Sequence, residues 1–194
     1  MFETIRVVNR IPLNLGYHNA RLNRSRRALF GSGDTIDLRD VVRIPDNIGS
    51  GEIKCRVEYA EAIARVEFVA YRRKAITSLS LVECDAIEYA HKFVDRSCIE
   101  SLVRSVTTDD ILIVKHGRIT DASFANVVFY DGTKWITPST PLLFGTARAR
   151  LLDDQTLVAD EIKKTDLKLF REVALINAML DLENTHRIDV HWIV

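Results

Sequence analysis

The chain has 194 residues, 47% of them hydrophobic, and its 27 basic and 27 acidic side chains give a formal net charge of zero. This composition supplies a substantial core and excludes a fibrous or disordered protein, while the zero net charge provides no overall field for nucleic acid or an anionic membrane. Three cysteines without Cys-x-x-Cys spacing and histidines without ligand spacing predict a reducing cytoplasm, no disulfide framework and no metal site. Without a secretory leader pattern or a membrane-spanning apolar run, we expect no membrane association.

The first part of the chain shows the alternation of apolar and polar residues that is typical of β-strands. Strands are expected at residues 2–8, 11–14, 53–59, 63–71 and 76–82. Within residues 53–59 every second side chain is apolar, which indicates a half-buried antiparallel strand. The sequence therefore predicts a small antiparallel α+β lobe that spans residues 1–83.

Two helices are expected in this first lobe. Residues 16–30 are rich in arginine and carry leucines at seven-residue spacing, which predicts an amphipathic helix with a narrow apolar stripe. Three arginines of this helix are expected on a solvent-exposed face: Arg24, Arg26 and Arg27. Residues 35–42 predict a short helix capped by Asp34 or Thr35, and residues 45–51 predict a loop.

The second part of the chain, residues 84–194, mixes strand patterns with short helices. Strands are expected at residues 111–114, 127–130, 157–162, 173–179 and 187–194. Asp95 is a candidate N-cap for the helix that follows it, and Asp131-Gly132 is typical of a hairpin turn. The sequence therefore predicts a second, larger lobe that begins near residue 84.

Residues 110–150 contain the features that point to chemistry. The carboxylate of Asp121 lies between two predicted strands, and Gly145 precedes a short helix that carries Arg148. A glycine-led helix N-terminus offers backbone N–H groups to an anion, and the Arg148 guanidinium faces the same space. An acid beside such a helix indicates a site for an anionic cofactor with a protonated ring. From the residues alone, Asp121 is more often a turn residue and Lys92 a surface lysine.

Several motifs, in this order and rough spacing, resemble the pyridoxal-phosphate enzymes of aminotransferase class IV. They are His18–Leu22 (HNARL), Lys92 in KFVDR, Asp121 in ITDASFANVVFY, Thr137-Pro138, and Gly145–Arg148 (GTAR). The family includes branched-chain and D-amino-acid aminotransferases and aminodeoxychorismate lyase. The resemblance extends over most of the chain. It implies the two-lobed fold type IV of D-amino-acid aminotransferase with a barrel-like larger lobe, a homodimer, and pyridoxal 5'-phosphate as cofactor.

The resemblance also implies roles for individual residues. Lys92 is expected to bond to the cofactor and to act as the catalytic residue, and Asp121 is expected to hold the ring nitrogen protonated. The phosphate is expected to be bound by Arg21, Thr146, Ala147, Asn177 and Ala178. Arg56 and Arg96 are candidates for substrate binding, although Arg56 also fits an ordinary exposed strand arginine.

Two residues depart from the family's usual pattern. Asp121 stands where glutamate is usual, so the ring must lie nearer or a water must bridge, and Ala147 stands where threonine is common. The turn at Asn177-Ala178 looks more like the Asn-Ser of the lyases. We therefore expect a lyase resembling aminodeoxychorismate lyase, which forms 4-aminobenzoate and pyruvate on the folate route. The alternatives are a class IV aminotransferase acting on branched-chain or D-amino acids, and a non-catalytic protein that binds pyridoxal phosphate.

Overall fold

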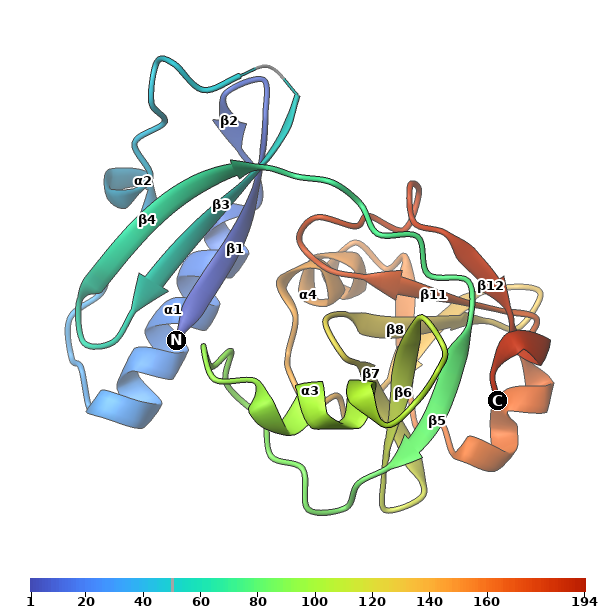
Figure 1. Cartoon of the computed structure of the whole chain (residues 1–194). Coiled ribbons are helices and arrows are strands. Elements are labelled where there is room, and N and C mark those ends of the chain that lie inside the picture. The colour runs from blue at the N-terminus through green and yellow to red at the C-terminus, as the bar shows by residue number, and fades with distance from the viewer. Residues whose placement is uncertain (50) are drawn as a thin grey trace. The chain divides into compact units, whose positions relative to one another are not determined.

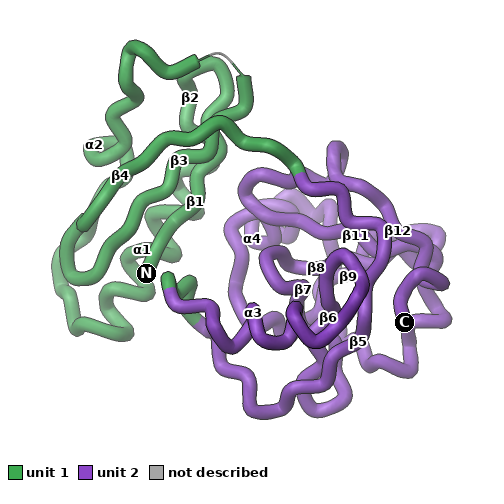
Figure 2. Tube along the Cα trace, viewed as in Figure 1, with its two compact units in different colours: residues 1–73, 91–94 green, residues 74–90, 95–194 purple. Residues whose placement is uncertain are grey.

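The structure, a computed structural model, describes residues 1–49 and 51–194. The described chain divides into two compact units, which Figure 2 shows in different colours. Unit 1 contains residues 1–73 and 91–94, and unit 2 contains residues 74–90 and 95–194. Each unit has a sheet of its own, so the expected mixed α+β protein with two lobes is confirmed.

Unit 1 is built on a four-stranded antiparallel sheet in the order β2, β1, β3, β4 (Figure 1). The strands are β1 (Phe2–Val8), β2 (Ile11–Pro12), β3 (Glu52–Tyr59) and β4 (Ile63–Ala70). In β3 every second residue is buried, as the alternation predicts. Those buried side chains join Ile5 and Val7 of β1 in one apolar cluster. Burial of this face against a helix is what fixes the register of the strands.

Helix α1 (Leu15–Phe30) supplies that cover and ends at Gly31, which has a left-handed φ of 68° suited to glycine. Leu22 of α1 is fully buried in the apolar cluster. The predicted exposure of Arg26 is wrong, because the residue is only 2% exposed. Its guanidinium donates to the Glu61 carbonyl at 2.8 Å and to the Asp34 carboxylate at 3.0 Å. These partners compensate the burial of the charge.

Helix α2 (Leu38–Val41) is shorter than the predicted helix at residues 35–42. Its N-cap is Asp37 rather than Asp34 or Thr35, because the Asp37 carboxylate accepts from the Arg39 N–H at 2.9 Å. The predicted loop at residues 45–51 includes Ser50, which lies outside the described residues.

Unit 2 is built on an eight-stranded sheet of mixed direction. Its strands are β5 (Leu79–Glu83), β6 (Asp110–Lys115), β7 (Arg118–Ala122), β8 (Asn126–Tyr130), β9 (Trp135–Pro138), β10 (Leu157–Asp160), β11 (Glu172–Ile176) and β12 (Arg187–Asp189). The pairs β5 with β6 and β9 with β10 are parallel, and the remaining pairs are antiparallel. Strand β8 pairs with β11 along its length and with β7 and β9 at its two ends.

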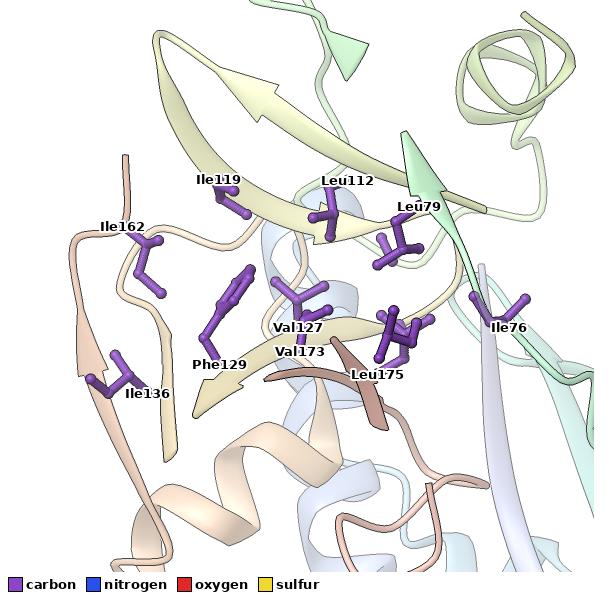
Figure 3. Packing of buried hydrophobic residues seen from close by; sticks show 13 residues of the cluster. Ile76, Leu79, Leu112, Ile119, Val127, Phe129, Ile136, Ile162, Val173 and Leu175 are labelled. Atoms are coloured by element: carbon purple, nitrogen blue, oxygen red, sulfur yellow. The ribbon is translucent and has the colours of Figure 1, made fainter. Parts of the chain in front are cut away.

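Strand β8 contributes to two apolar clusters of unit 2, one with Val127 and Phe129 and the other with Val128. Figure 3 shows Leu112 and Ile119 of β6 and β7 pointing toward Val127 and Phe129 of β8. All four side chains are fully buried. This packing holds β7 and β8 rigidly, which matters because both carry polar residues of the candidate site.

The helices of unit 2 are short. They are α3 (Ser97–Arg104), α4 (Thr146–Asp153), and the 3₁₀ helices η1 (Lys164–Leu169) and η2 (Val190–Trp192). The N-cap of α3 is Arg96 and not the predicted Asp95, which lies one residue earlier and accepts from the Ser97 N–H at 2.9 Å. The strand predicted at residues 187–194 is wrong beyond Asp189, where the chain turns into η2. None of the described helices is long and apolar enough to cross a membrane.

The boundary between the units differs from the one expected at residue 83. Unit 1 ends at Arg73, because β5 forms its parallel pair with β6 and therefore belongs to unit 2. Residues 91–94 belong to unit 1, where the Phe2 N–H donates to the Lys92 carbonyl at 3.0 Å. Local alternation identified β5 as a strand and could not indicate which sheet it joins.

Candidate functional site

Asp121 lies on β7, a strand that the sequence analysis did not separate from its neighbours. It is directly opposite Asn126 on β8, so the two side chains are adjacent. Nδ2 of Asn126 donates to Oδ1 of Asp121 at 2.6 Å, and the Leu143 N–H donates to Oδ2 at 2.9 Å. Both carboxylate oxygens are held, so the carboxylate has a defined orientation.

The charge of Asp121 is poorly compensated within this arrangement. Burial raises the pKa of the carboxyl group to about 6, although hydrogen bonds from Leu143 and Asn126 and the charge of Arg148 act in the opposite direction. A carboxyl group in this state gains free energy when a cation comes into contact with it. The site therefore suits a ligand that presents a protonated nitrogen to Asp121.

The pKa of Asp121 predicts a pH dependence of stability in the ligand-free protein. Because the folded pKa of about 6 exceeds the ordinary value of 3.8, stability is greatest below pH 4 and falls as the pH rises to 6. At 1.36 kcal/mol per pH unit, this contribution is roughly 3 kcal/mol. Asp121→Asn should remove that decline. Urea unfolding of both proteins between pH 4 and 7 checks this, and an unchanged difference in unfolding free energy across the range would contradict it.

The N-terminus of α4 offers hydrogen-bond donors to an anion. Thr146 and Ala147 occupy its first turn and are buried, and the N–H groups of a first turn have no partner within the helix. Arg148 is 6% exposed and donates through Nη2 to the Pro138 carbonyl at 2.8 Å. Among the described residues, its Nε is buried with no hydrogen-bond partner. The helix start and Arg148 thus suit a phosphate.

Asn177 and Ala178 follow β11 in a turn that Asn177 itself stabilises. Oδ1 of Asn177 accepts from the N–H groups of Met179 at 2.8 Å and Leu180 at 3.0 Å. Nδ2 donates to the carbonyl of Phe124, in the turn between β7 and β8, at 3.4 Å. The Asn177 carboxamide therefore holds two turns together, and phosphate binding at Asn177 and Ala178 stays a prediction.

Lys92 and Arg56 contact the same aromatic ring in unit 1. Nζ of Lys92 lies 4.9 Å from the centroid of the Phe2 ring, and Cζ of Arg56 lies 3.9 Å from it. Arg56 also forms an ion pair with Glu58 at 2.8 Å and is half-buried. The structure thus brings the predicted catalytic lysine close to one of the two predicted substrate arginines.

Arg21 is buried on α1 and pairs with a carboxylate that the sequence analysis missed. Its Nε and Nη2 donate to the two oxygens of Glu3 at 2.9 and 2.5 Å, and Nδ1 of His18 lies 2.6 Å from Oε2 of Glu3. Burial would raise the pKa of Glu3, but Arg21 and His18 outweigh it and lower this pKa to about 2. Glu3 shares a strand face with Ile5 and Val7, and an acid on such an apolar face was the available signal.

Arg96, the other predicted substrate residue, lies in unit 2 and contacts the turn between β7 and β8. Its Nη2 donates to the Ser123 carbonyl at 2.5 Å, and its Nε is buried with no hydrogen-bond partner among the described residues. This contact gives Arg96 a structural role beside the strand that carries Asp121.

The predicted site residues divide between the two units. Unit 1 contains Arg21, Arg56 and Lys92. Unit 2 contains Arg96, Asp121, Thr146, Ala147, Asn177 and Ala178. Within unit 2 the acid, the start of α4 and the Asn177 turn are connected through Leu143, Asn126 and Phe124.

Comparison with known proteins identifies relatives of the whole chain. The family model "Amino-transferase class IV" matches residues 100–184. An "Uncharacterized protein" of Haemophilus influenzae is 35% identical over 182 residues, which cover 92% of this chain and 97% of the relative. A crystal structure of a "putative 4-amino-4-deoxychorismate lyase" from Haemophilus somnus 129PT is 32% identical with a TM-score of 0.86, and the match covers 94% of this chain and 97% of that one.

More distant structures share the same fold. A "hypothetical aminotransferase" from Mycobacterium tuberculosis, in its PLP-bound form, is 16% identical with a TM-score of 0.77, and the match covers all of this chain and 80% of that one. The fold of this chain is therefore that of the fold type IV aminotransferases. Since the Haemophilus somnus relative matches over nearly the whole length at 32% identity, the chain belongs to the amino-transferase class IV family.

Proposed function

We propose that this chain is a pyridoxal-phosphate-dependent lyase that converts 4-amino-4-deoxychorismate to 4-aminobenzoate and pyruvate. Membership of the class IV family supports an enzyme that uses pyridoxal phosphate. The lyase reaction is supported by the name of the Haemophilus somnus relative. We further propose that the enzyme is a cytoplasmic homodimer that serves the folate route.

The residues of unit 2 fit this cofactor. Asp121 is the observation that carries the proposal, because a buried carboxyl group with a pKa raised to about 6 gains a partner in a protonated pyridine nitrogen. The start of α4 and the orphaned Nε of Arg148 suit the phosphate group. The carboxylate of Asp121 is shorter than the usual glutamate, but its two hydrogen bonds hold it in place.

When bound, pyridoxal phosphate supplies an aldehyde carbon that bonds to amines and a protonated ring that stores an electron pair. Lys92 supplies the amine that anchors the cofactor and later acts as the proton carrier. Asp121 keeps the ring nitrogen protonated. Arg21, Thr146, Ala147, Asn177 and Ala178 bind the phosphate in this proposal, and Arg56 and Arg96 bind substrate carboxylates.

The lyase course depends on where Lys92 delivers its proton. Its amine removes the proton from the substrate carbon that bears the amino group and returns it to the methylene carbon of the enolpyruvyl side chain. The bond between the ring carbon and the ether oxygen breaks, pyruvate leaves, and the substrate ring becomes aromatic. In an aminotransferase the same lysine returns the proton to the cofactor instead, and a keto acid is released.

A product assay separates these courses. With 4-amino-4-deoxychorismate we expect 4-aminobenzoate and pyruvate in equal amounts over many turnovers, without any added keto acid. Chromatography of 4-aminobenzoate and a coupled enzymatic assay for pyruvate measure the two products. Turnover that requires both an amino acid and a keto acid, tested with branched-chain and D-amino acids, would replace the lyase by an aminotransferase. Cofactor binding without turnover of either kind would indicate a non-catalytic pyridoxal-phosphate protein.

A further inference from the structure

The carboxamide of Asn126 connects three parts of unit 2. Its Nδ2 donates both to Oδ1 of Asp121 at 2.6 Å and to the carbonyl of Leu143 at 2.8 Å. The N–H of Leu143 in turn donates to Oδ2 of Asp121. A closed ring of hydrogen bonds thus joins β7, β8 and the segment that leads into α4. Asn126 is 6% exposed, so solvent does not compete for these bonds.

Gly145 lies against the other end of the same carboxamide. A Cβ atom placed on Gly145 would lie 1.9 Å from Oδ1 and 3.0 Å from Cγ of Asn126. Its φ of −71° is open to any residue, so close approach is the reason for glycine here. Asn126 therefore spans the distance from Asp121 to the residue that caps α4.

We infer that Asn126 is a positioning residue, which fixes the Asp121 carboxylate and the N-terminus of α4 in one arrangement. Residue 145 is glycine because any larger side chain would collide with the Asn126 carboxamide. The functional part of this inference rests on the proposed cofactor, whose ring nitrogen and phosphate are assigned to these two places. The geometric part rests only on the contacts of Asn126 with Asp121, Leu143 and Gly145. A ligand that bridges both places needs their separation fixed before it binds.

A double-mutant cycle on the cofactor-free protein tests the geometric part. Gly145→Ala alone should lower the urea midpoint, because the methyl group displaces the Asn126 carboxamide. Asn126→Ala alone should also lower it. The double variant should be no less stable than Asn126→Ala, since the atoms that the methyl group meets are gone. Gly16→Ala is the control, because a Cβ there meets nothing within 4 Å, and it should leave the midpoint unchanged or raise it. Additive losses in the cycle would overturn the inference.

A second variant keeps the inference testable if Asn126→Ala does not fold. Asn126→Asp keeps the shape of the side chain but places a second carboxyl group against Asp121, and two adjacent buried carboxyl groups resist ionisation. Its stability should therefore fall more steeply than that of the parent protein between pH 4 and 7. Parallel pH profiles would show that residue 126 does not face Asp121 and would overturn the inference.

The functional part is measured by fluorescence titration with pyridoxal phosphate. Asn126→Ala should bind it about tenfold more weakly, which is the loss expected for one buried hydrogen bond to a charged group. If Asn126→Ala binds pyridoxal phosphate as tightly as the parent protein while the stability cycle is non-additive, the positioning role is overturned. The packing of Gly145 against Asn126 then still holds. If the parent protein binds no pyridoxal phosphate, the proposed function fails, whereas the coupling between Asn126 and Gly145 still stands or falls on the stability cycle.

Discussion

Lys92→Ala should abolish turnover of 4-amino-4-deoxychorismate, with a loss of roughly 10³-fold or more in kcat, because it removes both the anchoring amine and the proton carrier. The fold should survive, since the backbone hydrogen bond from the Phe2 N–H of β1 to the Lys92 carbonyl is kept. Lys54→Ala on β3 is the matched control, because it removes a half-buried lysine of the same unit. It should leave kcat unchanged.

Chemical labelling identifies the lysine directly. Reduction of the cofactor-loaded protein with borohydride, followed by digestion and mass mapping, should place the cofactor mass on the peptide that contains Lys92. A label on a different lysine, or no label in saturated protein, would refute the assignment. This result does not depend on the substrate, so it holds for a lyase and for an aminotransferase alike.

Glu3→Ala should lower the free energy of unfolding by about 3–5 kcal/mol, because it leaves the buried guanidinium of Arg21 without its carboxylate. Arg21→Ala should also lower it, because the buried Glu3 carboxylate keeps only His18 as a partner among the three side chains. The double variant should lose less than the sum of the two, and urea unfolding of all three proteins measures this coupling. Arg24→Ala is the control, since Arg24 is exposed on the same helix. Equal losses for Arg24→Ala and Arg21→Ala would contradict the burial argument.

The ion pair between Arg21 and Glu3 leads to two further predictions, one for cofactor binding and one for stability at low pH. Arg21→Ala should weaken pyridoxal phosphate binding far more than Arg24→Ala or Arg27→Ala, because only Arg21 is proposed to reach the phosphate. The folded pKa of Glu3 lies below its ordinary value of 4.5, so its contribution to stability is present above pH 4.5 and disappears as the pH falls toward 2. Glu3→Ala should therefore flatten the acid limb of a stability curve.

Much of the fold could be predicted from local patterns. The alternation in β3 and the Asp131-Gly132 turn between β8 and β9 are confirmed, because each depends on a few neighbouring residues. Strand β7 was missed, since its five residues include Thr120 and Asp121 and show no alternation. The membership of β5 in unit 2 could not be predicted, because strand pairing is decided by partners far along the chain.

The candidate site could likewise be predicted only where it depends on residues that are near one another in the sequence. Short motifs identified Asp121 and the start of α4, and in the structure the Leu143 N–H, in the segment that leads into α4, donates to Asp121. The positions of Glu3 and Asn126 depend on pairings between elements, namely β1 with α1 and β8 with β7. The burial of Arg26 was missed for the same reason, because its carbonyl and carboxylate partners lie outside α1. Charged residues on an apparently polar helix face can thus be internal when another segment supplies their partners.

The order in which the chain is synthesised determines when residues 91–94 can join unit 1. The sheet of unit 1 can pair once β4 has left the ribosome, but the bond from the Phe2 N–H to the Lys92 carbonyl must wait until residues 74–90, which belong to unit 2, have also emerged. Closing so long a loop costs little more entropy than closing one of half its length, so the delay is set by translation and not by chain statistics. Nascent chains that stop at residue 73 should therefore carry a paired sheet without the lysine on which catalysis is proposed to depend.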